Sequence, residues 1–316
     1  MAHSERALDR ILRQPRMREA FELLTDELSG ADLTSLLLEV FRRRAEKLTP
    51  ADVVRRSSRD RFVRGVAIPF EWLRRVEDAC IAALPDVFRI TTLSPLVPLG
   101  THSALAPVDQ NNVVSTIRGT EVAADPTNGL SLYAASSRKQ ALASDPRSSE
   151  LFRRAAFQRV VRGQTFSGDL SFAHFELLGL VTAGRDSGDL AFERTSAEEH
   201  LRVIVAALSA LGASRIRLEL TDFTGERFAL LIGHLREVLA TDGVEVVERP
   251  DRPSGNGYYE GFCFKAFPTF EGEPFEVADG GFVDWTRKLV GSEKERLLIS
   301  GVGLDRVAMS SLVAQG

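Results

Sequence analysis

The chain has 316 residues, of which 44% are hydrophobic and 27% are charged. These proportions are typical of a soluble globular protein and exclude a wholly disordered or collagen-like chain. A formal net charge of -4 gives no sign of a strong nucleic-acid-binding surface.

No run of about 18 apolar residues occurs, so we expect no membrane span. Residues 1–30 are charged throughout and lack the apolar segment of a signal peptide, which favours a cytoplasmic location. Cys80 and Cys263 lie far apart and outside any cysteine–histidine motif. We therefore predict neither a disulfide framework nor a zinc site.

Apolar residues recur at helical spacing from residue 4 to about 64, and helix-entry signals stand at Ser29 and Thr49. We predict a helical N-terminal unit over residues 1–65 and a second domain over residues 66–316. The run Arg42-Arg43-Arg44 is read as a solvated helix face, with a phosphate contact as the alternative.

The second domain reads as an irregular succession of helices and strands. Predicted helices cover residues 70–84, 128–142, 197–211, 227–239 and 304–313. Predicted strands cover residues 87–93, 113–117, 157–164, 172–181, 216–220, 244–247, 258–267, 276–277 and 297–301. Glycine-containing turns are expected at Gly280-Gly281 and at Gly301–Gly303. Several neighbouring strands read as hairpins, which favours an α+β fold with an antiparallel sheet flanked by helices over a doubly wound sheet.

Three segments, in order, resemble the three signature motifs of class II aminoacyl-tRNA synthetases. Residues 70–95, a helix and a strand that close on Pro95, resemble motif 1, which forms that family's dimer interface. Residues 159–176 (RVVRGQ, a polar loop over 165–171, then FAHFE) resemble the motif 2 hairpin. Residues 299–306 (ISGVGLDR) resemble motif 3, a glycine-rich passage from a strand to a helix.

The resemblance implies a homodimer that uses ATP and Mg²⁺. Arg162 would hold the α-phosphate and Arg306 the γ-phosphate, as catalytic residues. The implied ATP contacts are Arg162, Gln164, His174, Phe175, Gly301, Gly303 and Arg306, with His174 or Phe175 under the adenine. Mg²⁺ would be bound mainly by ATP oxygens, with Glu176 or Asp284 as carboxylate ligands.

Within class II, the chain resembles the histidyl-tRNA synthetase branch, which includes the regulatory subunit of ATP phosphoribosyltransferase. Residues 257–264 (GYYEGFCF) resemble its DYYTGxxFE strand, and residues 279–284 (DGGFVD) its GGRYD turn. Residues 124–128 (ADPTN) stand in the place of RPEGT, where an acid and a threonine bind the substrate ammonium. The implied substrate contacts are Asp125, Thr127, Leu177, Val181, Tyr258 and Tyr259.

The chain also departs from that branch. Gln164 replaces the motif 2 glutamate, and the arginine of RGLDYY lies opposite Ser254, with Arg252 nearby but offset. The two residues that read imidazole fall on Leu177 and Val181, so the pocket should be more apolar than one for histidine. The chain ends soon after motif 3, so no anticodon-binding domain is expected.

Each implied site residue also has a structural interpretation. Arg162 and Arg306 can be ordinary surface or ion-paired arginines, and Asp125 followed by proline is a typical helix N-cap. The glycines of residues 301–303 can simply turn a strand into a helix. His174 in an apolar strand can be a core histidine. Tyr258 and Tyr259 alternate on a predicted strand, so one ring should be in the core.

The leading hypothesis is ATP-dependent activation of an amino acid or related small carboxylate as an adenylate, without conventional tRNA charging. The alternative is a non-catalytic regulatory or ligand-sensing protein that resembles the ATP phosphoribosyltransferase regulatory subunit. A third hypothesis is a synthetase paralogue that acts as a scaffold through its helical N-terminus.

Overall fold

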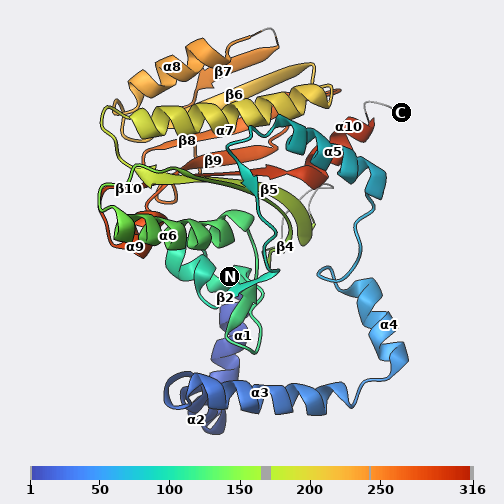
Figure 1. Cartoon of the computed structure of the whole chain (residues 1–316). Coiled ribbons are helices and arrows are strands. Elements are labelled where there is room, and N and C mark those ends of the chain that lie inside the picture. Colours follow the sequence, from blue (N-terminus) through green and yellow to red (C-terminus); the bar gives the residue numbers. More distant parts are fainter. Residues whose placement is uncertain (1, 165–171, 242, 314–316) are drawn as a thin grey trace. The chain divides into compact units, whose positions relative to one another are not determined.

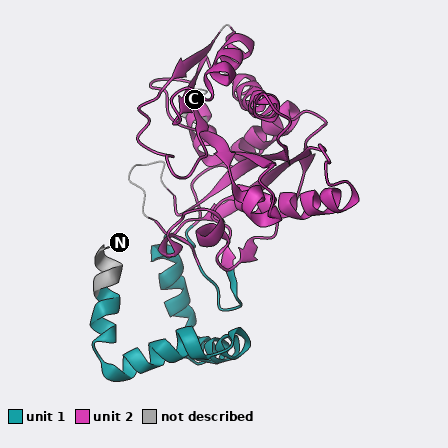
Figure 2. Ribbon diagram, turned by 90° about the vertical axis from the view of Figure 1, so that its left-hand side faces the viewer, with its two compact units in different colours: residues 1–64, 115–120 teal, residues 65–114, 121–316 magenta. Residues whose placement is uncertain are grey.

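The computed structural model describes residues 2–164, 172–241 and 243–313. The chain divides into two compact units, one of Met1–Arg64 with Ser115–Thr120 and one of Gly65–Val114 with Glu121–Gly316 (Figure 2). The predicted polar loop over residues 165–171 lies outside the described residues. Within the described part, no helix is long and apolar enough to cross a membrane.

The N-terminal residues form helices, as their periodicity predicts. These are α1 (Ala2–Leu12), α2 (Pro15–Glu22), α3 (Gly30–Ala45) and α4 (Pro50–Arg59). The side chains of Ser29 and Thr49 cap α3 and α4 by accepting from backbone N–H groups of their first turns. Arg42 and Arg43 both bond to Glu39 on the exposed surface of α3, which confirms the solvated-face interpretation.

The larger unit contains an eight-stranded sheet with the order β1-β4-β5-β10-β9-β8-β6-β7. In chain order its strands are β1 (Arg89–Ile90), β4 (Phe152–Val161), β5 (His174–Arg185), β6 (Arg215–Asp222), β7 (Val244–Glu248), β8 (Phe262–Thr269), β9 (Ala278–Val283) and β10 (Glu295–Gly303). Neighbouring strands are antiparallel except for the parallel pairs β1–β4 and β6–β7. Strands β2 (Leu96–Pro98) and β3 (Thr120–Val122) form a separate two-stranded sheet. The predicted α+β fold and the predicted β4–β5 hairpin are confirmed.

Helices cover both faces of the large sheet (Figure 1). One face packs against α5 (Phe70–Ala83), α7 (Ala191–Ala210), α8 (Ala229–Leu239) and α10 (Leu304–Val313). The other packs against α6 (Pro126–Ser144) and α9 (Trp285–Val290). Because side chains alternate along a strand, Leu178 and Leu180 join the first core, whereas Val181 joins the second. The α6 face carries the candidate site.

Two predicted strands are corrected. Residues 113–117 form no continuous strand, although Val114 accepts from the Val122 N–H and Thr116 donates to Thr120, and the strand of this segment is β3. The strand predicted over 87–93 is reduced to Arg89–Ile90.

The two tyrosines do not alternate on a strand. The backbone N–H groups of Tyr258 and Tyr259 both donate to the Gly255 oxygen, at 3.1 and 2.9 Å, so the two residues lie in a turn before β8. Their rings meet edge to face with centroids 4.9 Å apart, and both pack against the core on the α6 face. The prediction of one ring on each sheet face is therefore wrong.

The predicted glycine turns are also wrong. Gly280 and Gly281 lie inside β9, and Gly301 and Gly303 lie inside β10, which runs directly into α10. A Cβ on Gly280 would lie 2.5 Å from Phe264 Cζ, and one on Gly281 would lie 2.6 Å from Tyr259 Cδ1. The glycine pair therefore leaves room for aromatic rings of neighbouring segments.

Candidate functional site

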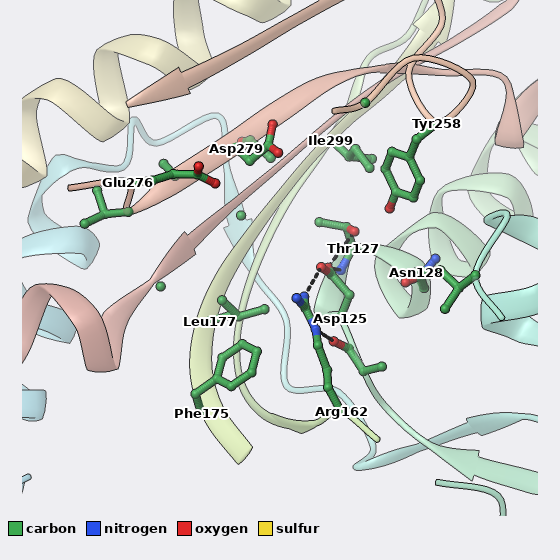
Figure 3. Close-up of a pocket in the computed structure, with 18 of the residues that line it drawn as sticks. Asp125, Thr127, Asn128, Arg162, Phe175, Leu177, Tyr258, Glu276, Asp279 and Ile299 are labelled. Atoms are coloured by element: carbon green, nitrogen blue, oxygen red, sulfur yellow. Dashed lines mark hydrogen bonds and ion pairs between the residues drawn. The ribbon is translucent and has the colours of Figure 1, made fainter. Parts of the chain in front are cut away.

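A cavity of about 490 Å³ opens on the α6 face of the sheet (Figure 3). Its walls come from the start of α6, the hairpin β4–β5, the turn before β8, the ends of β9 and β10, and the first turn of α10. Most of the predicted site residues line it: Asp125, Thr127, Arg162, Gln164, Phe175, Glu176, Leu177, Tyr258, Tyr259, Gly301, Gly303 and Arg306.

Three predicted site residues are not among the described residues that line this cavity. His174 lies beside Arg159, with 3.3 Å between its Nδ1 and Arg159 Nη1, so Phe175 is the aromatic residue of this strand that faces the cavity. Val181 is wholly buried in the core beneath α6. Asp284 precedes α9 and pairs with Lys288 at 3.0 Å.

Arg162 follows the last residue of β4, where its backbone N–H still donates to Ala173, the residue before β5. Its Nε donates to the Ala124 oxygen at 3.0 Å, and its Nη2 bonds to Asp125 Oδ2 at 3.2 Å. The guanidinium also lies over the Phe175 ring, 5.0 Å from the centroid. Arg162 is thus ion-paired, which agrees with the structural interpretation of this residue. The same contacts fix its guanidinium at the cavity wall.

Asp125 caps α6 with one carboxylate oxygen. Its Oδ1 accepts from the backbone N–H of Thr127 at 2.9 Å and from the Thr127 hydroxyl at 2.7 Å. Its Oδ2 accepts from Arg162. The N-cap interpretation is confirmed, and the same carboxylate lines the cavity.

Arg306 reaches the cavity from the first turn of α10. Its Nη1 donates to the backbone oxygen of Glu276 at 3.2 Å. Within the described part of the chain, no carboxylate forms an ion pair with Arg306. Gly301 lies nearby on β10, and a Cβ there would meet no atom within 4 Å. The backbone of β10 therefore borders open space at this position.

Sequence reasoning missed a second charged pair in the cavity wall. Arg252, only 6% exposed, donates from Nη2 to Asp279 Oδ2 at 2.7 Å, and its guanidinium faces the Tyr259 ring. Burial raises the pKa of Asp279, and Arg252 opposes this shift. Ser254 stands opposite the arginine of RGLDYY, and Arg252 is offset from it by two residues. Both residues line the cavity, so Arg252 reaches it despite this offset.

A buried histidine supports the start of α6 and was also missed. His102 Nε2 accepts from the backbone N–H of Ala124 at 2.9 Å, so this ring nitrogen carries no proton. His102 Nδ1 then donates to Glu121 Oε1 at 2.6 Å. His102 and Glu121 lie in an irregular segment and a short strand, with no spacing motif that marks them.

Of the two carboxylates expected beside Mg²⁺, Glu176 lies in the cavity wall and Asp284 does not. Glu176 lines the cavity but bonds to Arg159, and burial together with nearby Glu77 raises its pKa. Asp284 precedes α9 and is not among the described residues that line the cavity. Among the residues that the structure describes, no group of three or more histidine, cysteine, aspartate or glutamate side chains is placed to hold a metal.

No family model and no curated protein sequence matches this chain. Solved structures do match it at low sequence identity. The ATP phosphoribosyltransferase regulatory subunit/histidyl-tRNA synthetase from Bacillus halodurans superimposes with a TM-score of 0.57 at 14% identity, over 78% of this chain and 81% of that one. Histidyl-tRNA synthetase from Nostoc sp. PCC 7120 gives 0.59 at 13%, over 81% and 75%. A histidine–tRNA ligase subunit from Alicyclobacillus acidocaldarius gives 0.54 at 15%, over 79% and 95%.

The larger unit has the fold of a class II aminoacyl-tRNA synthetase core. The resemblance to class II synthetases expected from the three motifs is therefore confirmed for the fold. Arg162 and Arg306, from the segments that resemble motifs 2 and 3, line one cavity of this fold. At these identities the superpositions carry the fold and no activity.

Proposed function

We propose that this protein uses ATP to activate an amino acid or a related small carboxylate as an adenylate. The observation that carries the proposal is that Arg162 and Arg306, far apart in the sequence, line the same cavity. Guanidinium groups are permanently charged and bind phosphate in a bidentate manner, so two on separate rigid elements suit an extended polyphosphate.

The described residues fit ATP. Arg162 would hold the α-phosphate and Arg306 the γ-phosphate, and Phe175 offers an aromatic face beside Arg162. Gly301 leaves room for close approach of the nucleotide to the backbone. Mg²⁺ would be bound mainly by the ATP oxygens.

The proposed reaction is a displacement at the α-phosphorus. A carboxylate oxygen of the substrate attacks this phosphorus, the bond to the bridging oxygen breaks, and pyrophosphate leaves. Asp125 would attract the substrate ammonium, with Thr127 beside it. Arg162 would neutralise charge that builds up on the α-phosphate in the transition state.

The acceptor of the activated group is proposed to be something other than a conventional tRNA. The formal charge of -4 supports this, because tRNA binding relies on many phosphate contacts by basic side chains. A ligand-sensing role is the second candidate. The Arg162–Asp125 ion pair favours it, because each group partly neutralises the one that would bind ATP or substrate.

Amino-acid-dependent ATP–pyrophosphate exchange tests the proposal. We expect exchange with at least one standard amino acid, and a loss of at least ~100-fold in Arg162→Ala and in Arg306→Ala. Arg202→Ala is the matched control, because Arg202 is an exposed arginine of α7 outside the cavity lining. Measurable ATP binding without exchange for any amino acid would instead support the sensor.

A further inference from the structure

Asn128 is a buried polar residue of the cavity wall. It lies in the first turn of α6 and is only 2% exposed. Its Nδ2 is fully buried and has no hydrogen-bond partner among the described residues. A buried amide left without a partner is unfavourable, so its presence needs a specific explanation, of which a ligand contact is one.

The cavity wall near Asn128 combines the Asp125–Arg162 ion pair with apolar and neutral side chains. Figure 3 shows the Tyr258 ring extending from above toward Thr127 and Asn128, with Ile299 beside it and Leu177 on the opposite wall. Tyr258 packs edge-on against Trp285, with centroids 5.9 Å apart, which fixes its ring. Burial raises the pKa of Tyr258, so its hydroxyl keeps its proton and can donate.

The carboxylates of the cavity are already in use. Each one that the described part of the lining contains bonds to a cation: Asp125 to Arg162, Asp279 to Arg252, Glu276 to Lys265, and both Glu176 and Asp305 to Arg159. A cationic ligand side chain would compete with one of these partners, except at Asp279 Oδ1, which is buried and has no hydrogen-bond partner among the described residues. An anionic one would meet the neutral groups of Asn128 and Tyr258, which compensate buried charge poorly.

The spacing along α6 limits the ligand length. Asp125 is the N-cap and Asn128 is three residues further on, which is a rise of about 4.5 Å along the helix. A ligand whose ammonium meets Asp125 therefore reaches Asn128 with a short side chain.

We propose that Asn128 and Tyr258 select an amino acid with a short, uncharged polar side chain, either a carboxamide or a hydroxyl, held between Leu177 and Ile299. This inference rests on the proposed function for the ligand being an amino acid. The class of ligand side chain is inferred from the unpartnered amide of Asn128 and from the ion pairs that the cavity carboxylates already form.

Isothermal titration of the full chain without ATP tests the inference. The probes are L-asparagine, L-glutamine, L-serine and L-threonine, compared with L-leucine, L-valine, L-histidine, L-lysine and L-glutamate. We expect the tightest ligand to come from the first group and to bind at least ~10-fold more tightly than leucine.

Two variants separate ligand selection from a structural role. Asn128→Leu should weaken the preferred ligand at least ~10-fold, leave leucine unweakened, and keep or raise the melting temperature, because it removes an unpartnered polar group. Tyr258→Phe should weaken the same ligand by a smaller factor. Gln140→Leu, on an exposed position of the same helix, should change neither quantity.

Leucine or valine binding as tightly as the first group would overturn the inference, as would no binding by any of the four polar amino acids. A fall in melting temperature with equal weakening of every ligand in Asn128→Leu would assign Asn128 a structural role instead.

If binding follows the expected order but exchange is silent, the adenylation proposal fails and this inference stands. If leucine supports exchange and Asn128→Leu leaves it unchanged, this inference fails alone.

Discussion

Glu121 is a wholly buried carboxylate that organises the backbone beneath the cavity. It accepts from the backbone N–H groups of Gly100 and His102 at 3.0 and 2.9 Å, from Gln110 Nε2 at 2.8 Å, and from His102 Nδ1. His102 then fixes Ala124, whose oxygen accepts from Arg162. One carboxylate therefore helps to set the position of a guanidinium that it does not touch.

Glu121→Gln should lower the free energy of unfolding by about 2–3 kcal/mol at pH 7, because an amide N–H₂ would replace an acceptor that faces N–H donors. Burial raises the pKa of Glu121, but the hydrogen bonds from Gln110, His102 and Gly100 outweigh burial, and the net shift is downward. A depressed pKa stabilises the fold above the unfolded-state value, about 4.3, and this contribution is lost as the pH falls. The gap between wild type and variant should therefore narrow at and below about pH 4.

Urea unfolding at pH 7 and pH 4 measures both effects. Glu271→Gln is the control, because Glu271 is exposed and lies outside the cavity lining. Equal stability of wild type and Glu121→Gln at pH 7, or a gap that does not change with pH, would contradict the role assigned to this carboxylate.

The start of α6 lies directly on strand β5 because that strand carries glycine there. Gly179 of β5 pairs with Gly301 of β10 in the sheet register. A Cβ on Gly179 would lie 2.7 Å from Pro126 Cγ, whereas one on Gly301 would meet nothing within 4 Å. The first glycine lets the helix approach the sheet, and the second borders the cavity.

These two glycines give opposite predictions for the same substitution. Gly179→Ala should destabilise the fold by about 1–3 kcal/mol, because Pro126 and the Asp125 cap must move. Gly301→Ala should leave stability unchanged or slightly higher but weaken ATP binding, because its methyl group enters the space proposed for the nucleotide. Chemical unfolding and ATP titration of both variants test this pair, and a Gly301→Ala protein with full ATP affinity would place the nucleotide elsewhere.

Hydrophobic periodicity predicted α5, α6, α7, α8, α10 and the β4–β5 hairpin, because these elements bury one regular face. It failed where tertiary packing decides the conformation. Gly280-Gly281 has the composition of a turn, yet it lies in a strand because the Phe264 and Tyr259 rings need its space. Tyr258 and Tyr259 resemble strand residues, yet Gly255 closes them into a turn.

The candidate site was predictable where side chains lie within a motif, as for Arg162, Asp125 and Arg306. Asn128, Arg252 and His102 lie in the cavity wall because particular segments pack together there, and a single sequence does not show that packing. Val181 was misplaced because it lies four residues beyond Leu177 on the same strand face, where α6 already covers the sheet.

At the scale of the whole molecule, the motif 1 resemblance predicts a homodimer, and apolar side chains are exposed in that segment. Strand β1 is at the edge of the large sheet, with Val87 and Ile90 54% and 49% exposed beside it. Edge strands with exposed apolar residues favour association with another chain. We expect light scattering to give a dimer at micromolar concentration and Ile90→Glu to give a monomer.

Leu230→Glu is the matched control for this dimer, because Leu230 is an exposed leucine of α8, 87% exposed. It should leave the dimer intact. A monomeric wild type, or a dimer that Leu230→Glu disrupts and Ile90→Glu does not, would contradict an interface at β1.

Titration of ATP and AMP against wild type, Arg162→Ala and Arg306→Ala tests most directly whether the two arginines hold opposite ends of one nucleotide. We predict that Arg162→Ala weakens both ligands at least ~10-fold, whereas Arg306→Ala weakens ATP by a similar factor and changes AMP by less than about twofold. Equal losses for both nucleotides in Arg306→Ala, or no loss for ATP in either variant, would contradict the account.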